Sequence, residues 1–482
     1  MLDDLMRERK LKLARYKKSA DPYPAQVKRT ASVNEAVSDF SKLEKSKKVL
    51  WLVGRVLALR VQGGIVFGDL KDESGVIQFI LKKGDTENFE LLKDTLDIGD
   101  FVEIKGTLSK TKRGEKSISA REAKMISKSL RPLPQSWYGL GNIETRLRKR
   151  YLDTVLNADV KKMFEKKSAF WDAIRDFLKK EGFLEVETPV FENLPGGAEA
   201  EPFKTHHNAL DRDFFLRISL ELPLKKMLVG GYEKVFEIGR VFRNEGIDPE
   251  HLQDYTQLEF YWAYADYREL MKFVEKMYKA AVKATCGTLK IKSRGHEMDW
   301  GKKWKIADYS ESFKKAIGLN PLTATREELA AKAKSLKLEF EPSAGKGRLI
   351  DTIYKKSIRP FIIEPTLLIN HPVLISPLAK RRPENPETTE RVQVLAYGSE
   401  LGNGWSELND PIDQRKRFEE QMALRAKGDK EAQYLDEEFL EAIEYGMPPA
   451  AGFGMSERFF AILMDKPIRE TVFFPLMRED NK

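Results

Sequence analysis

Residues 236–260 constrain the fold more than any other part of the sequence, because two strand-like runs there are joined by a short polar loop. They read FEIGRVFRNEGIDPEHLQDYTQLEF, and the loop is rich in turn-forming residues. Two strands joined by so short a loop pair antiparallel. The strand-like runs in this part of the chain lie at 183–191, 213–222, 234–243 and 256–265. They do not alternate regularly with helices. The pattern predicts a mainly antiparallel sheet flanked by helices, an α+β fold.

The chain is too long for one hydrophobic core, since its 482 residues exceed what a single core usually supports. A helical pattern near the amino terminus ends at DPYP, and five short β-rich runs follow. Five such runs fit a small closed barrel of the oligonucleotide-binding type, because an open sheet would expose long edges. After a linker, ETRLRKRYLD begins a helical region that extends to about residue 180. We predict a helical arm at 1–48, a barrel at 49–129, a linker at 130–145 and a larger domain at 146–482, with a helical insertion at about 322–360.

Positive charge is concentrated in the first third of the chain. Residues 1–150 hold 32 Lys and Arg against 20 Asp and Glu, whereas residues 151–482 hold 52 against 55. A basic module joined to a near-neutral remainder suggests a polyanionic partner such as nucleic acid. A solvated Lys-rich surface explains the same charge, and both interpretations stay open.

Several classes of protein are excluded. The single cysteine, Cys286, can form neither an intrachain disulfide nor a Cys-rich zinc site. No secretory leader and no run of about 18 apolar residues is present, so we predict a cytoplasmic protein that does not enter a membrane. The P-loop pattern GxxxxGK[ST] is absent. If the protein uses a nucleotide, it must bind it in another way.

The polar loop carries side chains suited to binding phosphate. Arg243 and Glu245 lie two residues apart at the end of the first run, which predicts that both project from the same face. A guanidinium can grip phosphate or carboxylate oxygens with two hydrogen bonds, and Glu245 can orient it. His251 offers a donor to phosphate, and Tyr255 offers a flat face for stacking on a base. Each residue alone would also suit the surface of an ordinary hairpin.

Two later segments combine arginine, acids and aromatics in the same way. In GFGMSERFF, Gly452 and Gly454 leave bare backbone just before Arg458, which begins a predicted helix. The segment ELGNGWSELND offers a polar lining with one aromatic wall, formed by Glu400, Asn403, Trp405 and Glu407. A core tryptophan with surface acids is the alternative interpretation.

These segments resemble a known family. FRNE at 242–245 resembles the second signature motif of class II aminoacyl-tRNA synthetases, GFGMSER at 452–458 the third, and EVETPVF at 185–191 the end of the first. GGAEAEPFKTHHNAL, LRISLEL, NEGI, YWAYADY, LGNGWSELND and LRPLP are similar to bacterial-type lysyl-tRNA synthetases in order and spacing. The resemblance covers nearly the whole chain. It implies a class II antiparallel-sheet catalytic domain with an N-terminal OB-fold barrel, acting as a homodimer that attaches lysine to tRNA(Lys) through lysyl-adenylate.

The resemblance also implies roles for individual residues. Catalysis would rest on Arg243, Glu245 and Arg458. ATP would be bound by Arg243, Glu245, His251, Tyr255, Glu259, Glu400, Gly454 and Arg458. L-lysine would be bound by Gly197, Glu221, Tyr261, Asn403, Trp405 and Glu407. Mg²⁺ would be held by Glu400 and Gln393, and the anticodon would contact Arg60, Phe67 and Gln78.

Within that family pattern, Glu221 and the Gly197 carbonyl would receive the α-amino group of lysine. Glu407 and Tyr261 would receive its ε-ammonium. A buried ammonium needs carboxylates or other acceptors around it. An aspartate or asparagine enzyme would instead need a cation or an amide where Glu407 stands.

The sequence departs from the family pattern at four positions. Glu250 stands where an arginine usually precedes the histidine of the second motif, and Leu252 follows that histidine. Gln393 replaces an acidic metal ligand, and Glu201 replaces a basic residue. A carboxylate beside phosphates would repel them unless a cation intervenes. Two alternatives therefore stay open, a synthetase-like RNA-binding regulator without activation chemistry and a ligase that attaches lysine to a protein.

Overall fold

The computed structural model describes residues 2–134, 140–246, 248, 250–428 and 432–478. The chain folds as two compact units, Met1–Gly141 and Asn142–Lys482, and each is considered separately. Within the described ranges no helix is both long and apolar enough to span a membrane.

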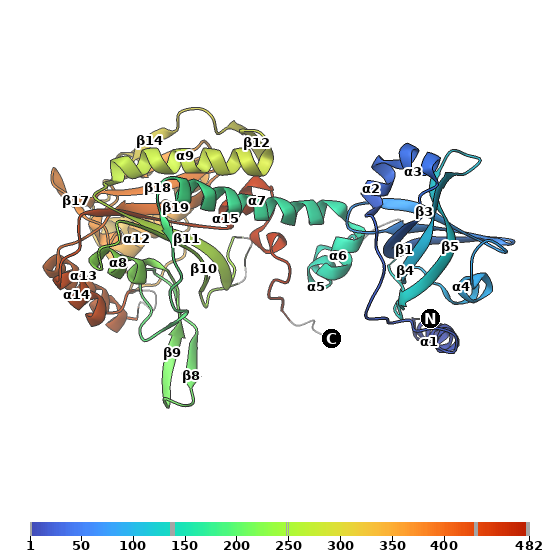
Figure 1. The fold of residues 1–482 in the computed structure, drawn as a ribbon. Helices are drawn as coiled ribbons and strands as arrows, with labels where there is room; N and C mark the ends of the chain where they lie inside the picture. Colours follow the sequence, from blue (N-terminus) through green and yellow to red (C-terminus); the bar gives the residue numbers. More distant parts are fainter. Residues whose placement is uncertain (1, 135–139, 247, 249, 429–431, 479–482) are drawn as a thin grey trace. The chain divides into compact units, whose positions relative to one another are not determined.

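The first unit is a closed five-stranded barrel, which confirms the predicted OB-type architecture (Figure 1). Around the barrel the strands run in the order β1-β2-β3-β5-β4. Their bounds are β1 Leu50–Gln62, β2 Ile65–Lys71, β3 Val76–Lys82, β4 Phe101–Lys110 and β5 Lys116–Ser127. Alternate residues of each strand fill the interior, and Tyr16 and Phe40 from the helices add to the same core. Those helices are α1 Leu2–Lys17, α2 Val33–Ser38, α3 Phe40–Ser46 and α4 Phe89–Thr95.

The second unit is built on an eight-stranded sheet in the order β14-β15-β18-β19-β20-β11-β10-β6. Only the two edge pairs, β14–β15 and β10–β6, are parallel, so the predicted mainly antiparallel sheet is confirmed. The strands are β14 Lys305–Asp308, β15 Thr366–Ile369, β18 Arg391–Ala396, β19 Ser399–Ser406, β20 Ala450–Ser456, β11 Asp254–Ala263, β10 Lys234–Phe242 and β6 Leu184–Glu185.

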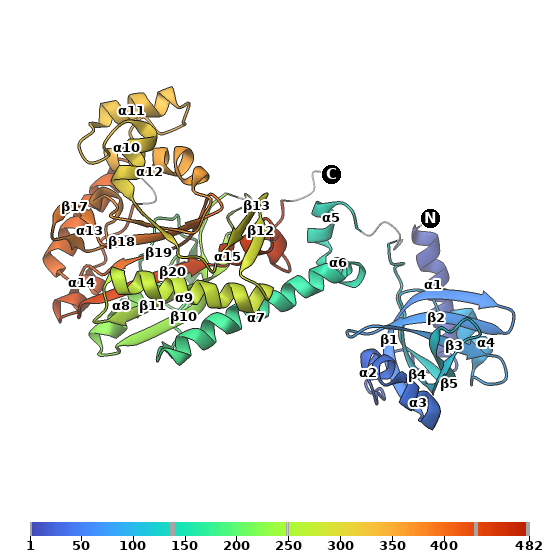
Figure 2. The ribbon, with the colours of Figure 1, turned by 90° about the horizontal axis from the view of Figure 1, so that it is seen from above.

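Helices cover both faces of this sheet (Figures 1 and 2). One face is covered by α7 Ala158–Lys180 and α9 Tyr267–Cys286, and the other by α8 Glu221–Val229, α13 Pro411–Ala426 and α14 Glu437–Glu444. Two cores result, one on each face, because successive strand residues point to opposite sides.

The remaining helices and strands of the second unit are shorter or lie outside the main sheet. The helices are α10 Tyr309–Ile317, α11 Arg326–Ser335, α12 Lys346–Ser357, α15 Arg458–Leu463 and the short 3₁₀ helices Arg359–Phe361, Val373–Ile375 and Ile468–Thr471. The strands are β7 Phe191–Glu192, β8 Lys204–His207, β9 Arg212–Leu216, β12 Lys290–Ser293, β13 His296–Asp299, β16 Arg381–Arg382 and β17 Asn385–Thr389.

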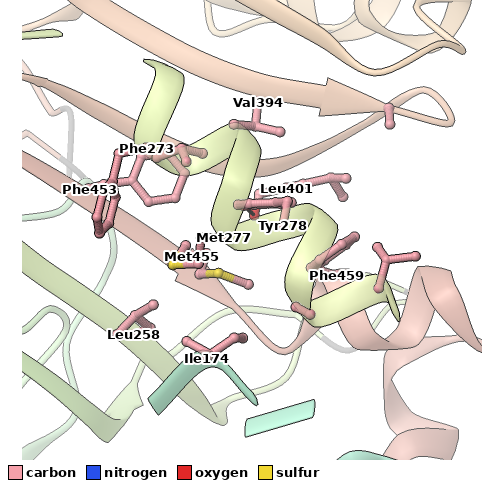
Figure 3. Close-up of a cluster of buried hydrophobic side chains, with 14 of the residues drawn as sticks. Ile174, Leu258, Phe273, Met277, Tyr278, Val394, Leu401, Phe453, Met455 and Phe459 are labelled. Atoms are coloured by element: carbon pink, nitrogen blue, oxygen red, sulfur yellow. Dashed lines mark hydrogen bonds between the residues drawn. The ribbon is translucent and has the colours of Figure 1, made fainter. Parts of the chain in front are cut away.

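Helix α9 shows how local sequence and packing combine. A capping box formed by Asp266 and Glu269 begins the helix, and Gly287 in the left-handed region ends it. Its Tyr278 packs with Phe453 of β20 in the buried cluster of Figure 3, and each such side chain contributes about 1.5–3 kcal/mol by burial. Gly402 makes this possible, since a Cβ there would lie 2.4 Å from the Phe453 ring.

Two sequence-based boundaries were wrong. The strand predicted at 213–222 ends at Leu216, and α8 begins at Glu221, because Leu224 and Leu228 bury a helical face against the sheet. The run at 183–191 forms only β6 and the first residue of β7, since Pro189 has no N–H for a ladder. The predicted helical region before residue 180 is confirmed and consists of three helices, α5 Ile143–Arg148, α6 Arg150–Leu156 and α7.

Candidate active site

A cavity of about 430 Å³ lies in the second unit, on the face of the sheet opposite α9. Most of the residues predicted to bind lysine and ATP line it. They are Gly197, Glu221, Arg243, Tyr255, Glu259, Tyr261, Gln393, Glu400, Asn403, Trp405, Gly454 and Arg458. Glu245, His251 and Glu407 are not among the lining residues.

Strand register brings distant segments of the sequence into two rows across the sheet. The first row joins Tyr261, Gly452, Trp405 and Arg391, and the second joins Glu259, Gly454, Asn403 and Gln393. Directly opposed residues in antiparallel strands share a face. The functional residues of four strands therefore meet on one surface.

Gly452 on β20 leaves room for the cavity between Glu407 and Tyr261. A Cβ on Gly452 would lie 2.3 Å from Glu407 Oε1 and 2.3 Å from the Tyr261 ring. On the same strand, Phe453 and Met455 point into the α9 core instead. The alternation in GFGM thus presents bare backbone to the cavity and apolar side chains to the core.

Three buried acids cluster beside the cavity. Glu221, Glu259 and Glu407 are each at most 3% exposed. Lys225 bridges two of them, with its Nζ 2.5 Å from Glu221 Oε1 and 2.5 Å from Glu407 Oε2. Trp405 Nε1 also donates to Glu407 Oε2 at 2.8 Å. Three carboxylates and one ammonium leave an excess of negative charge that an added cation would balance.

Burial raises the pKa of Glu221 to about 8 and that of Glu407 to about 7, although Lys225 lowers both. The pKa of Glu259 is also raised by burial. The pKa of Lys225 is raised because Glu221 and Glu407 together outweigh its burial. An incoming ammonium favours the ionised form of such a carboxyl group, so its binding is coupled to the release of a proton.

The Glu259 carboxylate is fixed by four hydrogen bonds from neighbouring groups. Its Oε1 accepts hydrogen bonds from Ser219 Oγ at 2.6 Å, the Leu220 amide at 3.1 Å and Gln257 Nε2 at 2.6 Å. Its Oε2 accepts from the Tyr261 hydroxyl at 2.8 Å. Both oxygens already have partners, so Glu259 orients the Tyr261 ring.

Two arginines face the cavity near Tyr255. The Arg243 guanidinium lies 5.5 Å from the centre of the Tyr255 ring, and its Nε donates to the Ile218 carbonyl at 3.1 Å. Arg458 begins α15 as predicted and donates to the carbonyls of Glu250 at 3.3 Å and Glu400 at 3.4 Å. An aromatic ring with two arginines near it is suited to a flat, anionic ligand.

The carboxylate of Glu250 is already paired with a cation. Its Oε1 accepts from Arg294 at 2.7 Å and from Ser399 Oγ at 2.8 Å, and the two arginines Arg294 and Arg458 help lower its pKa against the effect of burial. Leu252 is buried against Ala461 and packs with α15. The departures at these two positions therefore anchor the loop, and Glu250 does not line the cavity.

Glu245 and His251 lie outside the cavity wall. The strand β10 ends at Phe242, so strand alternation does not place Glu245 on the face of Arg243, and that argument from the sequence was wrong. His251 is half-buried, and its Nδ1 lies 2.7 Å from Asp248 Oδ2. Glu201 is exposed.

Two oxygens at the far side of the cavity suit a hard cation. Glu400 lines the cavity, with Oε2 3.6 Å from Arg359. Gln393 Oε1 is buried and has no hydrogen-bond partner among the described residues. No group of three or more His, Cys, Asp or Glu side chains within the described ranges could hold a metal by itself. One carboxylate with one neutral oxygen fits Mg²⁺ that is bound mainly through a phosphate ligand.

In the barrel unit, the predicted anticodon residues share one outer face. Arg60 on β1 is opposite Phe67 on β2, and Gln78 lies on β3 two residues from Ile80, the other partner of Phe67. Phe67 is half-buried, whereas its neighbours Val66 and Gly68 point inward. Ser117 Oγ donates to Gln78 Oε1 at 2.9 Å.

Sequence reasoning missed Lys225 and Arg294. The pair Glu221 and Lys225 has the i, i+4 spacing that usually marks an exposed helical ion pair, so only its apolar neighbours in ELPLK hinted at burial. Arg294 lies in a tight turn between β12 and β13 and meets Glu250 from 44 residues away in the chain. No local pattern identifies that contact.

Comparisons with known proteins agree with this geometry. A family model described as tRNA synthetases class II (D, K and N) matches residues 142–478, and one described as OB-fold nucleic acid binding domain matches residues 50–126. The chain is 44% identical over 482 residues to a protein of Moorella thermoacetica named lysine–tRNA ligase, covering 99% of this chain and 98% of that one. It is 43% identical over 485 residues to the lysine–tRNA ligase of Pelotomaculum thermopropionicum, covering 99% and 95%. The lysine–tRNA ligase of a Roseiflexus species is 42% identical over 486 residues, covering 99% of each.

Proposed function

The chain belongs to the class II lysyl-tRNA synthetases, and we propose that it attaches lysine to tRNA(Lys) with Glu221 and Glu407 receiving the two ammonium groups of the amino acid. Lysine and ATP form lysyl-adenylate and pyrophosphate. The terminal 3′-hydroxyl of the tRNA then attacks the acyl carbon and releases AMP.

The observation that carries this assignment is the charge of the buried acid cluster. Glu221 and Glu407 share one resident cation, Lys225, and Glu259 is buried near them. Free lysine brings two ammonium groups, and its carboxylate can pair with Arg243. Glu407 Oε1, which has no hydrogen-bond partner in the described part of the chain, is the free acceptor for the ε-ammonium. Aspartate or asparagine would leave these acids without partners.

Arg243 and Arg458 support the activation step. Arg243 would contact both the lysine carboxylate and the α-phosphate, where negative charge is redistributed as the carboxylate attacks phosphorus. Tyr255 and Arg458 would hold the adenine between them, against the bare backbone at Gly454. The reaction needs no nucleophilic side chain, because positioning and charge stabilisation are sufficient. Roles for Glu245 and His251 toward the phosphates require the loop to approach the cavity when ATP binds.

Magnesium would be bound by Glu400 and by the unpartnered oxygen of Gln393, together with ATP phosphates. When bound, Mg²⁺ withdraws charge from the phosphate oxygens. Glu400 also keeps Arg458 in place through its backbone carbonyl. A neutral amide at position 393 lowers the negative charge that the protein presents to the nucleotide.

Lysine-dependent exchange of labelled pyrophosphate into ATP tests the proposal directly. We expect exchange with lysine and none with aspartate or asparagine. Charging of tRNA(Lys) in the same preparation then separates a tRNA ligase from a ligase that modifies a protein. A chain that binds tRNA but shows no lysine-dependent exchange would instead be a regulator.

Lysine affinity should increase as pH rises from 6 to 8. The pKa of Glu221, raised to about 8, and that of Glu407, raised to about 7, mean that protons must leave these groups before both can pair with ammonium. Lysine binding should therefore release protons near pH 7, and affinity falls as pH drops through these values. Calorimetry in two buffers with different ionisation enthalpies measures the proton release. Proton uptake, or weaker binding at pH 8 than at pH 6, would contradict this expectation.

The outer face of the barrel is proposed to read the anticodon. The half-exposed ring of Phe67, with Arg60 and Gln78 beside it, supports a platform on which single-stranded bases stack. Residues 1–150, with their excess of basic side chains, supply the charge for the tRNA backbone.

Phe67→Ala should lower kcat/KM for tRNA by about tenfold or more, because stacking on one base contributes roughly 1–3 kcal/mol. Lysine-dependent pyrophosphate exchange should stay near the wild-type rate. Trp51→Ala is the matched control, since Trp51 lies on the half of β1 that pairs with β4. Equal losses in charging and in exchange would refute a separate anticodon module.

We further propose that the protein forms a homodimer through the first-motif region and acts in the cytoplasm, where tRNA is charged. Leu184 and Phe191 in that region expose 49% and 60% of their surface, which supports an apolar contact with a second copy. Light scattering that gave the mass of a single chain at micromolar concentration would disprove the dimer.

A further inference from the structure

Lys225 occupies an unusual place for a lysine, because its side chain is fully buried between two carboxylates. It lies one helical turn after Glu221 on α8, and Glu407 reaches it from the segment after β19. The rings of Trp405 and Phe439 lie 5.9 and 5.8 Å from its Nζ. A buried ammonium is costly unless its partners are well placed, so all of these groups constrain its position.

The bridge sets how far apart the two acids can lie. Both carboxylate oxygens are 2.5 Å from the same nitrogen, so they are separated by no more than about 5 Å. Without a cation between them, two like charges in a buried site would move apart or one would take up a proton. The remaining nearby acid, Glu259, is already held by hydrogen bonds from Tyr261 and three other donors.

We propose that Lys225 is a positioning residue that fixes the spacing of Glu221 and Glu407 and thereby selects an amino acid with an ammonium at the chain length of lysine. The inference rests on the proposed function, since it assumes that these two acids receive the two ammonium groups of lysine. Lys225 contributes one positive charge against two negative ones. Its contacts with both carboxyl groups hold them in place and favour their ionised form, which is the form that pairs with the ammonium groups of the substrate.

Selection by length follows from a fixed spacing. With its carboxylate at Arg243 and the acids held by the bridge, ornithine, which is shorter by one methylene, would not place its terminal ammonium where that of lysine meets Glu407, and one methylene in a fitted site typically changes kcat/KM by about 10- to 200-fold. When the bridge is lost, the acids can adjust to either substrate. The ratio of kcat/KM for lysine to that for ornithine should then fall.

Lys225→Met and Lys225→Gln, made in the full-length chain, test the inference by pyrophosphate exchange at saturating ATP. We expect the lysine-to-ornithine ratio to fall about tenfold or more in Lys225→Met, with a higher KM for lysine and a KM for ATP within about twofold of wild type. Lys225→Gln, which can still hydrogen-bond both acids, should show a smaller fall. Lys226→Met is the matched control, because Lys226 pairs with the exposed Glu438, and its ratio should equal that of wild type.

A wild-type ratio in folded Lys225→Met or Lys225→Gln would overturn the inference while leaving the proposed function intact. Failure of both variants to fold, measured by thermal melting beside Lys226→Met, would show that the fold rather than selection requires Lys225 and would also overturn it. Absence of lysine-dependent exchange in the wild-type chain would instead refute the proposed function. The three results are distinguishable in one set of assays.

Discussion

Glu407→Gln is expected to lower kcat/KM for lysine in pyrophosphate exchange by about 10²- to 10³-fold, because breaking a buried ion pair costs about 3–5 kcal/mol. The amide keeps the shape of the side chain, so the Trp405 contact at 2.8 Å can persist. The charge that meets the ε-ammonium is lost, however, and Lys225 keeps only Glu221 as an ionic partner.

ATP binding should remain measurable in Glu407→Gln, since the arginines near Tyr255 do not contact Glu407. Glu438→Gln is the control, because Glu438 is an exposed acid that forms an ion pair with Lys226 outside the buried cluster. Activation of lysine at the wild-type rate by Glu407→Gln would remove the assignment of Glu407 to the ε-ammonium.

Arg243→Lys should reduce kcat for adenylate formation by about 10²- to 10³-fold, the usual effect of removing one donor from developing negative charge. Lysine keeps the positive charge but not the planar fork that can contact a carboxylate and a phosphate at once. It also loses the Nε hydrogen bond to the Ile218 carbonyl. Single-turnover formation of lysyl-adenylate measures the chemical step directly.

Arg240→Lys is the matched control for this second experiment. Arg240 lies on β10, three residues before Arg243, is exposed and pairs with Asp254, so its replacement should leave the rate within about twofold of wild type, as is usual for an exposed ion pair. If Arg243→Lys changed only the KM for ATP and left kcat intact, Arg243 would bind the ground state rather than the transition state.

Much of the fold could be predicted because its signals are local. Turn residues between apolar runs predicted the hairpin of β10 and β11 and the five strands of the barrel. The predicted boundaries were wrong where tertiary packing determines the conformation. At Glu221, for example, α8 begins inside a run whose sequence is typical of a strand. The α-helical and extended conformations of such a short apolar run differ little in local free energy, so contacts with the sheet determine which one forms.

The sequence by itself determined the antiparallel hairpins, the glycine alternation of GFGM and GNGW, and the acids and arginines that identify the family, since these depend on backbone preferences and on residue type. Only the tertiary structure decided that Lys225 joins Glu221 to Glu407 and that Arg294 neutralises Glu250. In both cases, the partner of each charge and its burial depend on strands and turns that are distant in the sequence. The strength of a charge interaction depends on the distance and the solvent around it, and neither is defined until the chain has packed.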